Sequence, residues 1–74
     1  MNMEEKVLDI LRNLFEDDNI DETCSQRNCD KWDSMAQINL AIELEEAFGI
    51  ILEPEQIGEM VSYTDIVRIL NSIV

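Results

Sequence analysis

The sequence predicts an all-α protein, a small four-helix bundle. Only two glycines and one proline occur in 74 residues, so few positions would interrupt a helix. Apolar residues make up 46% of the chain and recur at helical spacing in each apolar segment. A chain of this length has material for one core only, and residues 1–74 are therefore expected to form a single domain.

The first predicted helix covers roughly residues 3–16. Projected at about 100° per residue, its apolar side chains fall on one side and its polar side chains on the other. This distribution predicts an amphipathic helix with one buried face. The apolar face consists of Met3, Val7, Leu8, Ile10, Leu11, Leu14 and Phe15.

A long, acidic loop without helical periodicity is predicted for residues 17–33. Loops of this length in small domains are usually functional or held by a few buried anchors. Ile20 and Trp32 are the expected anchors, and we expect the loop to lie across the bundle. Cys24 and Cys29 lack the further Cys or His ligands of a zinc site, so no metal site is expected. Free thiols are favoured for this pair, with a short-loop disulfide as the alternative.

The second predicted helix begins at Asp33-Ser34-Met35 and ends before Gly49, which has the position of a C-cap. Ser34 and the residue three places on, Gln37, fit a capping box, and Asp33 adds negative charge at the positive end of the helix. From the residues alone, a cap is the favoured interpretation of Ser34. No histidine or lysine is placed to make it a catalytic nucleophile.

Apolar residues cover most of the circumference of this second helix. The pattern predicts packing on several sides, with a branched aliphatic lining of the interior from Ile38, Leu40, Ile42 and Leu44. Gln37 and Glu45 are isolated polar exceptions. A narrow polar wedge is expected to face water, and it consists of Asn39, Glu43 and Glu46.

Two further helices are predicted after Gly49. Pro54 opens a short helix over residues 54–61, in which Ile57, Met60 and Val61 should point inward. Gly58 lowers its helix propensity, so this helix should be the least stable. Ser62 and Asp65 resemble a capping box for the last helix. The buried face of that helix is expected to contain Ile66, Val67, Ile69, Leu70, Ile73 and Val74.

Charge and composition exclude several classes of function. The formal net charge of −12 would repel nucleic acids and anionic membranes and favours partners with basic surfaces. No histidine is available as a base near neutral pH, and so small a chain cannot enclose a substrate, so an enzyme is disfavoured. The first residues lack the features of a signal peptide, and no apolar run approaches the ~20 residues that span a bilayer. We expect a complete, cytoplasmic, monomeric protein without stable membrane insertion.

Ser34 belongs to a longer pattern of residues. The stretch reads DKWDSMAQINLAIELEEAFGI, with Asp-Ser-apolar at the start of a helix and Phe48 before a loop and a short helix. This pattern resembles the acyl carrier protein family, whose members carry Asp-Ser-Leu at the start of their second helix. The resemblance covers residues 3–73. It implies the acyl-carrier type of bundle, with three longer helices, one short helix and a long loop between the first two.

The resemblance implies a discrete carrier protein and not an enzyme. Ser34 matches the serine to which a phosphopantetheinyl transferase attaches 4′-phosphopantetheine, whose thiol holds acyl groups as thioesters. Asp33 matches the aspartate before that serine and would help the transferase orient its substrate. Met35 matches the family's leucine, an exposed apolar anchor. Acyl-loading and acyl-processing enzymes with basic surfaces would bind Met35 together with the wedge residues Asn39, Glu43 and Glu46.

Several residues depart from carriers of primary fatty-acid biosynthesis. Asn39 stands where those carriers typically have an acidic residue, and Ala36 and Gln37 leave the first turn uncharged. The resemblance therefore favours specialised lipid, polyketide or cell-surface biosynthesis. Trp32 and the Ser-Met pair are also similar to D-alanyl carriers of cell-wall modification, so an aminoacyl or peptidyl carrier is one alternative. A helical interaction module that is never modified is the other.

Overall fold

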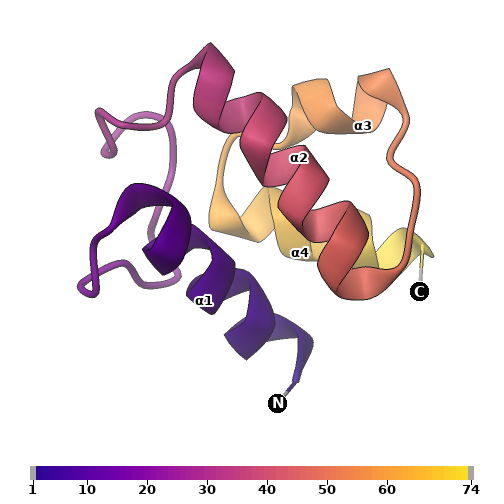
Figure 1. Ribbon diagram of the computed structural model, residues 1–74, viewed down its shortest axis with the longest axis horizontal. Helices are drawn as coiled ribbons and strands as arrows, with labels where there is room; N and C mark the ends of the chain where they lie inside the picture. Colours follow the sequence, from indigo (N-terminus) through magenta and orange to yellow (C-terminus); the bar gives the residue numbers. More distant parts are fainter. Residues whose placement is uncertain (1, 74) are drawn as a thin grey trace.

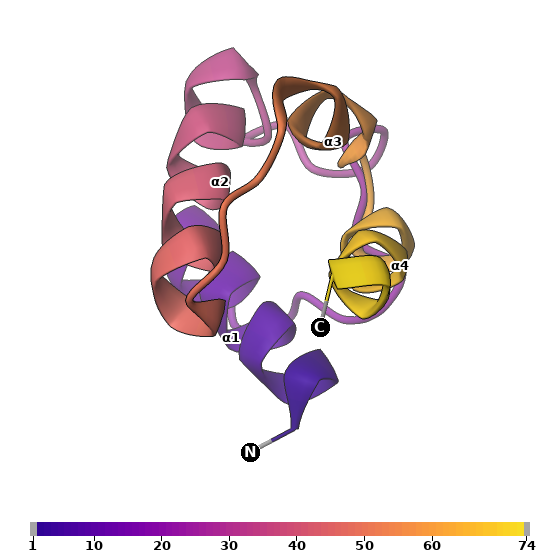
Figure 2. The ribbon, with the colours of Figure 1, turned by 90° about the vertical axis from the view of Figure 1, so that its right-hand side faces the viewer.

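The computed structural model describes residues 2–73, which form four helices and no strand. The helices are α1 (Met3–Phe15), α2 (Ser34–Phe48), α3 (Pro54–Glu59) and α4 (Tyr63–Ile73). Figure 1 shows α2 crossing in front of α4, with α1 and the long loop on one side of it and α3 on the other. Seen from the side, α2 and α4 lie on opposite sides of the molecule (Figure 2). The predicted small all-helical bundle is confirmed.

Local hydrogen bonds determine where α1 and α2 begin and end. The side chain of Asn2 accepts a hydrogen bond from the backbone N–H of Glu5, 2.8 Å away, and caps α1. Glu16 ends α1 in the left-handed conformation, with φ of 51°. Gly49 ends α2 with φ of 63°, a conformation that costs glycine little, and its predicted role as a C-cap is confirmed.

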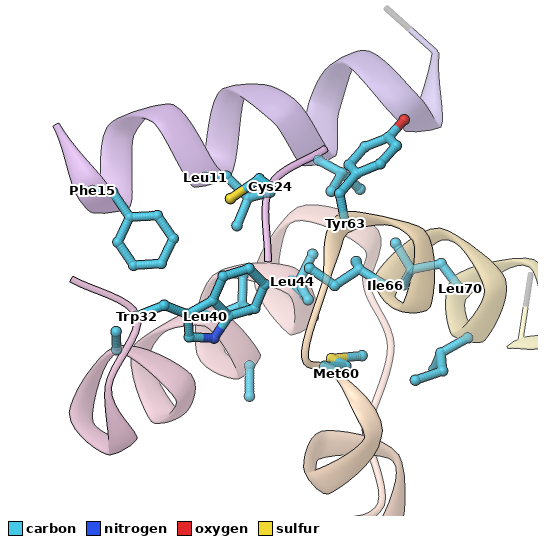
Figure 3. Packing of buried hydrophobic residues seen from close by; sticks show 14 of the residues in the cluster. Leu11, Phe15, Cys24, Trp32, Leu40, Leu44, Met60, Tyr63, Ile66 and Leu70 are labelled. Atoms are coloured by element: carbon cyan, nitrogen blue, oxygen red, sulfur yellow. The ribbon is translucent and has the colours of Figure 1, made fainter. Parts of the chain in front are cut away.

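The core is formed by side chains from α1, α2 and α4, from the loop before α2, and from Leu52 and Met60 on either side of α3 (Figure 3). On α1 and α4 these side chains lie on single stripes, as the amphipathic pattern predicted. Burying each of them contributes about 1.5–3 kcal/mol. The largest fully buried side chains are Val7, Leu11, Phe15, Leu40, Leu44, Met60, Ile66 and Leu70.

The loop between α1 and α2 lies across the bundle, with Ile20 and Trp32 buried as predicted. The backbone N–H of Gln26 donates to the carbonyl of Val61 at 2.9 Å. In return, the carbonyl of Cys24 accepts from the N–H of Tyr63, also at 2.9 Å. These bonds hold the middle of the loop against the start of α4.

The prediction that α2 packs on several sides is wrong. The side chains of Ile38 and Ile42, which were expected to line the interior, are 56% and 48% exposed. A chain of 74 residues has too few elements to surround a central helix. The buried residues of α2 instead occupy one side only: Ala36, Leu40, Ala41 and Leu44.

The helix that begins at Pro54 is shorter than predicted, because α3 ends at Glu59. Met60 follows the helix and is fully buried, whereas Val61 is 41% exposed, so the prediction that Val61 points inward is wrong. The chain turns here, with the N–H of Met60 donating to the carbonyl of Ile57 at 3.2 Å. Ile57 itself is half-buried.

The start of α4 is as predicted, but its end differs. The hydroxyl of Ser62 accepts from the N–H of Asp65 at 3.1 Å, which confirms the cap. Ile66, Ile69 and Leu70 are buried. Ile73, predicted on the same face, is 37% exposed because it lies beyond the reach of the core, and Val74 lies outside the described residues.

The contrast between Met60 and Val61 can be tested by truncation. We expect Met60→Ala to lower the free energy of unfolding by about 2–5 kcal/mol, because it leaves a cavity in the core. The matched variant Val61→Ala should change it by less than about 1 kcal/mol, because the side chain is partly exposed. Urea unfolding followed by circular dichroism measures both, and equal losses would contradict this packing.

Candidate functional site

Trp32 fixes the segment that enters α2. Its indole ring is buried and lies against the ring of Phe15, with centroids 5.5 Å apart. The indole N–H donates to the side-chain oxygen of Gln37 at 2.6 Å, and the backbone N–H donates to the carbonyl of Cys29 at 3.1 Å. The ammonium group of Lys31 donates to the carbonyl of Phe15 at 2.9 Å. The residues before α2 are therefore attached to the end of α1.

Asp33 is the N-cap of α2. Its side chain accepts from the N–H of Ala36 at 2.9 Å, and its carbonyl accepts from the N–H of Gln37 at 3.0 Å. Its backbone is extended, with φ of −101°, and the helix begins at Ser34. The predicted capping box between Ser34 and Gln37 is therefore wrong, because the aspartate before the serine already performs the capping.

Ser34 has an exposed side chain at the first position of α2. Its hydroxyl makes no hydrogen bond to any group within residues 2–73, and the N–H groups of Ser34 and Met35 have no acceptor there either. These N–H groups lie at the positive end of the helix dipole. A phosphate ester on this hydroxyl would meet unpaired donors and a favourable potential, which are the features that bind phosphate at helix N-termini.

An exposed surface extends along α2 from Ser34, and we call it the α2 face. It contains the side chains predicted there, Met35, Asn39, Glu43 and Glu46, all of which are exposed. Ile38 and Ile42 join them, although periodicity assigned both to the interior. Met35 is 66% exposed, a large fraction for so apolar a side chain. The α2 face thus combines apolar contact area with negative charge.

Gln37 is a polar residue of this region for which the sequence predicted no role beyond a cap. Its side-chain nitrogen donates to the carbonyls of Ile57 at 2.6 Å and Met60 at 2.8 Å. Its side-chain oxygen accepts from the indole of Trp32 and, at 3.4 Å, from the side chain of Gln26. The signal in the sequence was a polar residue on the otherwise apolar side of α2.

A separate cavity of about 370 Å³ lies in the loop before α2, and Ser34 does not line it. Phe15, Ile20, Cys24 and Cys29 form part of its wall. Both cysteines are free thiols, Cys24 buried and Cys29 half-buried. Burial, and next the neighbouring Cys29, raise the pKa of the Cys24 thiol to about 11. At neutral pH Cys24 is therefore an unreactive core residue.

No protein-family model matches this chain, and a search of the curated proteins finds no match either. Across residues 2–73, no group of three or more His, Cys, Asp or Glu residues is arranged to hold a metal ion. None of the helices in that range has both the length and the apolar composition needed to cross a membrane. Function must therefore be inferred from the geometry of Ser34 and its neighbours.

The division of roles between Asp33 and Ser34 can be tested by stability. We expect Asp33→Ala to lower the free energy of unfolding by about 1 kcal/mol, because α2 loses its cap. Ser34→Ala should change it by less than about 0.5 kcal/mol, since this hydroxyl bonds to nothing in the fold. Thermal and urea unfolding measure both, and a larger loss at Ser34 would restore the serine as the cap.

The raised pKa of Cys24 predicts selective thiol chemistry. A thiol with a pKa of about 11 is almost entirely protonated at pH 8, so iodoacetamide should alkylate Cys29 first. The rate at Cys24 should rise as the pH approaches 11, provided that the fold persists. Peptide mass spectrometry of timed samples gives both rates, with Cys24→Ser and Cys29→Ser as controls. Equal rates at pH 8 would show that Cys24 is accessible and ionised.

Proposed function

We propose that this protein is a discrete cytoplasmic acyl carrier, modified on Ser34 with 4′-phosphopantetheine. One observation carries the proposal: an exposed serine hydroxyl with no structural task at the first position of α2, beside a capping aspartate. The long loop before α2 and the short α3 support the acyl-carrier type of bundle. When bound, the arm supplies a terminal thiol that holds an acyl group as a thioester.

The residues around Ser34 fit the attachment of such an arm. Its hydroxyl lies on the surface, so a long substituent meets no side chain that it must displace. The N–H groups of Ser34 and Met35 are available to the phosphodiester. The carboxylate of Asp33 accepts a hydrogen bond from the N–H of Ala36. This bond offsets part of the repulsion between the carboxylate and the phosphodiester of the arm.

The protein acts as a substrate and partner of enzymes in this proposal, and it catalyses no reaction itself. The chain contains no histidine that could remove the proton of Ser34, so a phosphopantetheinyl transferase must add the arm. We propose that Asp33, which fixes the backbone on which Ser34 is mounted, also orients this serine within the transferase.

The α2 face is the proposed surface for partner enzymes. Met35, Ile38 and Ile42 provide exposed apolar contacts, and Glu43 and Glu46 lie on the same side. With a net charge of −12, the protein would be attracted to basic surfaces, with fast and salt-dependent association. Such interactions are weak enough for one carrier to visit the transferase and then several acyl-loading and acyl-processing enzymes.

The composition of the α2 face supports a specialised pathway. The first turn of α2 contains no acidic residue, and Asn39 is uncharged. Within α2, negative charge begins only at Glu43, so a basic group of a partner opposite the first turn would find only Asp33 to pair with. Specialised lipid, polyketide or cell-surface biosynthesis is therefore proposed over primary fatty-acid biosynthesis. An aminoacyl or peptidyl cargo on the same arm is the alternative.

The carrier proposal predicts modification of one serine only. We expect the wild-type protein to gain the mass of one phosphopantetheine with coenzyme A and a broad-specificity transferase. Ser34→Ala should gain none while keeping its stability, and Ser72→Ala, which removes another exposed hydroxyl, should react like the wild type. Asp33→Asn keeps a good cap but removes the charge, so slower labelling of this folded variant would support the role of Asp33. Intact-protein mass spectrometry measures each reaction.

The same experiment separates the alternatives. A wild-type protein that resists several transferases would rule out the carrier and favour the unmodified interaction module. If Ser34 is labelled, loading enzymes that activate fatty acids or amino acids distinguish an acyl carrier from an aminoacyl carrier.

A further inference from the structure

Gln37 joins α2 to the C-terminal end of α3. Both protons of its side-chain amide are used, one with the carbonyl of Ile57 at 2.6 Å and one with that of Met60 at 2.8 Å. The amide oxygen accepts from the indole of Trp32 at 2.6 Å. One side chain therefore connects α2, the last turn of α3 and the end of the long loop. Figure 1 shows this end of α3 beside the first half of α2.

Few other contacts hold α3 in place. No residue of Pro54–Glu59 is buried, and Ile57 is only half-buried. The buried side chains of Leu52 and Met60 lie before and after the helix, and the carboxylate of Glu59 lies 4.0 Å from the guanidinium of Arg68 on α4. Glu53 and Gln56 cap the helix from within, which stabilises α3 itself but does not attach it to α2. The amide of Gln37 is thus the main polar link between α3 and α2.

We propose that Gln37 is a specificity-determining residue, whose hydrogen bonds keep α3 closed against α2 and exclude aliphatic cargo from the core. This inference rests on the proposed function of Ser34 as the attachment site. Gln37 lies one helical turn after Ser34, so the boundary that it closes is the one nearest to the arm. Cargo on the arm is then held outside the bundle.

Polar and apolar contributions both favour exclusion. An acyl chain that enters between α2 and α3 at this point must separate Gln37 from the carbonyls of Ile57 and Met60. These groups would lose their partners in a partly buried place, which opposes entry. The side chains of Ile38 and Ile42 are turned outward, so the boundary also offers less apolar lining than the sequence predicted.

The test compares three variants that separate loss of the Gln37 hydrogen bonds from a change in charge. Gln37→Glu replaces the two N–H donors with an acceptor that faces two carbonyls, so the link to α3 should break. Gln56→Glu adds the same charge on α3, but the oxygen of Gln56 only accepts, from the N–H of Glu53, and a carboxylate can do the same. The third variant, Gln37→Met, removes the bonds without adding charge.

The arm is first attached to Ser34 in each protein, and its thiol is then left bare or carries hexanoyl, octanoyl or decanoyl groups. The measured quantity is the rise in melting temperature from the bare to the acylated form. In the wild type and Gln56→Glu we expect a small rise that is independent of chain length. In Gln37→Glu and Gln37→Met it should grow with chain length, by about 5 °C for each further methylene buried. If Gln37 had only a structural role, its substitution would lower the melting temperatures of the bare and acylated forms equally. The rise in melting temperature on acylation would then not change.

Gln37 bonds to the carbonyls of Ile57 and Met60, and the N–H groups of these residues donate to the carbonyls of Glu53 and Ile57. Hydrogen exchange of the unmodified proteins therefore reports on the opening of α3 that loss of the link should cause. The amides of Ile57 and Met60 should exchange about tenfold faster in Gln37→Glu than in Gln56→Glu. Equal exchange, or a wild-type rise that grows with chain length, would overturn the inference while leaving Ser34 as the attachment site. Failure to label Ser34 at all would remove the proposed function, and this inference with it.

Discussion

The buried indole of Trp32 is the interaction on which the rest of the site depends. A buried indole N–H requires an acceptor, and the side chain of Gln37 provides it at 2.6 Å. With its ring held against Phe15, Trp32 can occupy one position only, so the next residue begins the helix as its cap. Asp33 therefore takes the cap, and Ser34 is left on the surface with a free hydroxyl. The hydroxyl of Ser34 is therefore unbonded because Trp32, two residues earlier, is buried and fixed.

The buried side could be predicted for helices that have one purely polar side. For α2, which has no such side, it could not. On α1 and α4, periodicity alone identified the buried stripes, as at Leu11 and Leu70. On α2 the same method assigned Ile38 and Ile42 to the interior, because apolar residues follow one another around the helix. Which side is covered depends on how many elements the whole chain supplies, and a local pattern contains no information about that.

The position of the candidate site followed from Asp-Ser-apolar at a helix start, but the roles of its residues did not. Either Asp33 or Ser34 can cap a helix, and the choice depends on the extended backbone of Asp33, which the anchored tryptophan determines. Gln37 and Glu45 stood out as polar exceptions. Gln37 donates to the carbonyls of Ile57 and Met60, and Glu45 accepts from the N–H of Leu52. Such backbone groups leave no signature in a sequence.

The contacts of α2 with α1 and with α3 depend on different physical forces. Toward α1 the helix buries Leu40 and Leu44, and the ammonium group of Lys6 lies 5.4 Å from the ring centre of Phe48. Toward α3, the side-chain amide of Gln37 donates to the carbonyls of Ile57 and Met60, and the ion pair between Glu59 and Arg68 joins α3 to α4. A neutral amide is suited to close such a boundary, because it binds carbonyls without adding to the negative charge. Between α2 and α3, hydrogen bonds of one side chain are thus the main polar contact, whereas between α2 and α1 the contact is mainly buried apolar area.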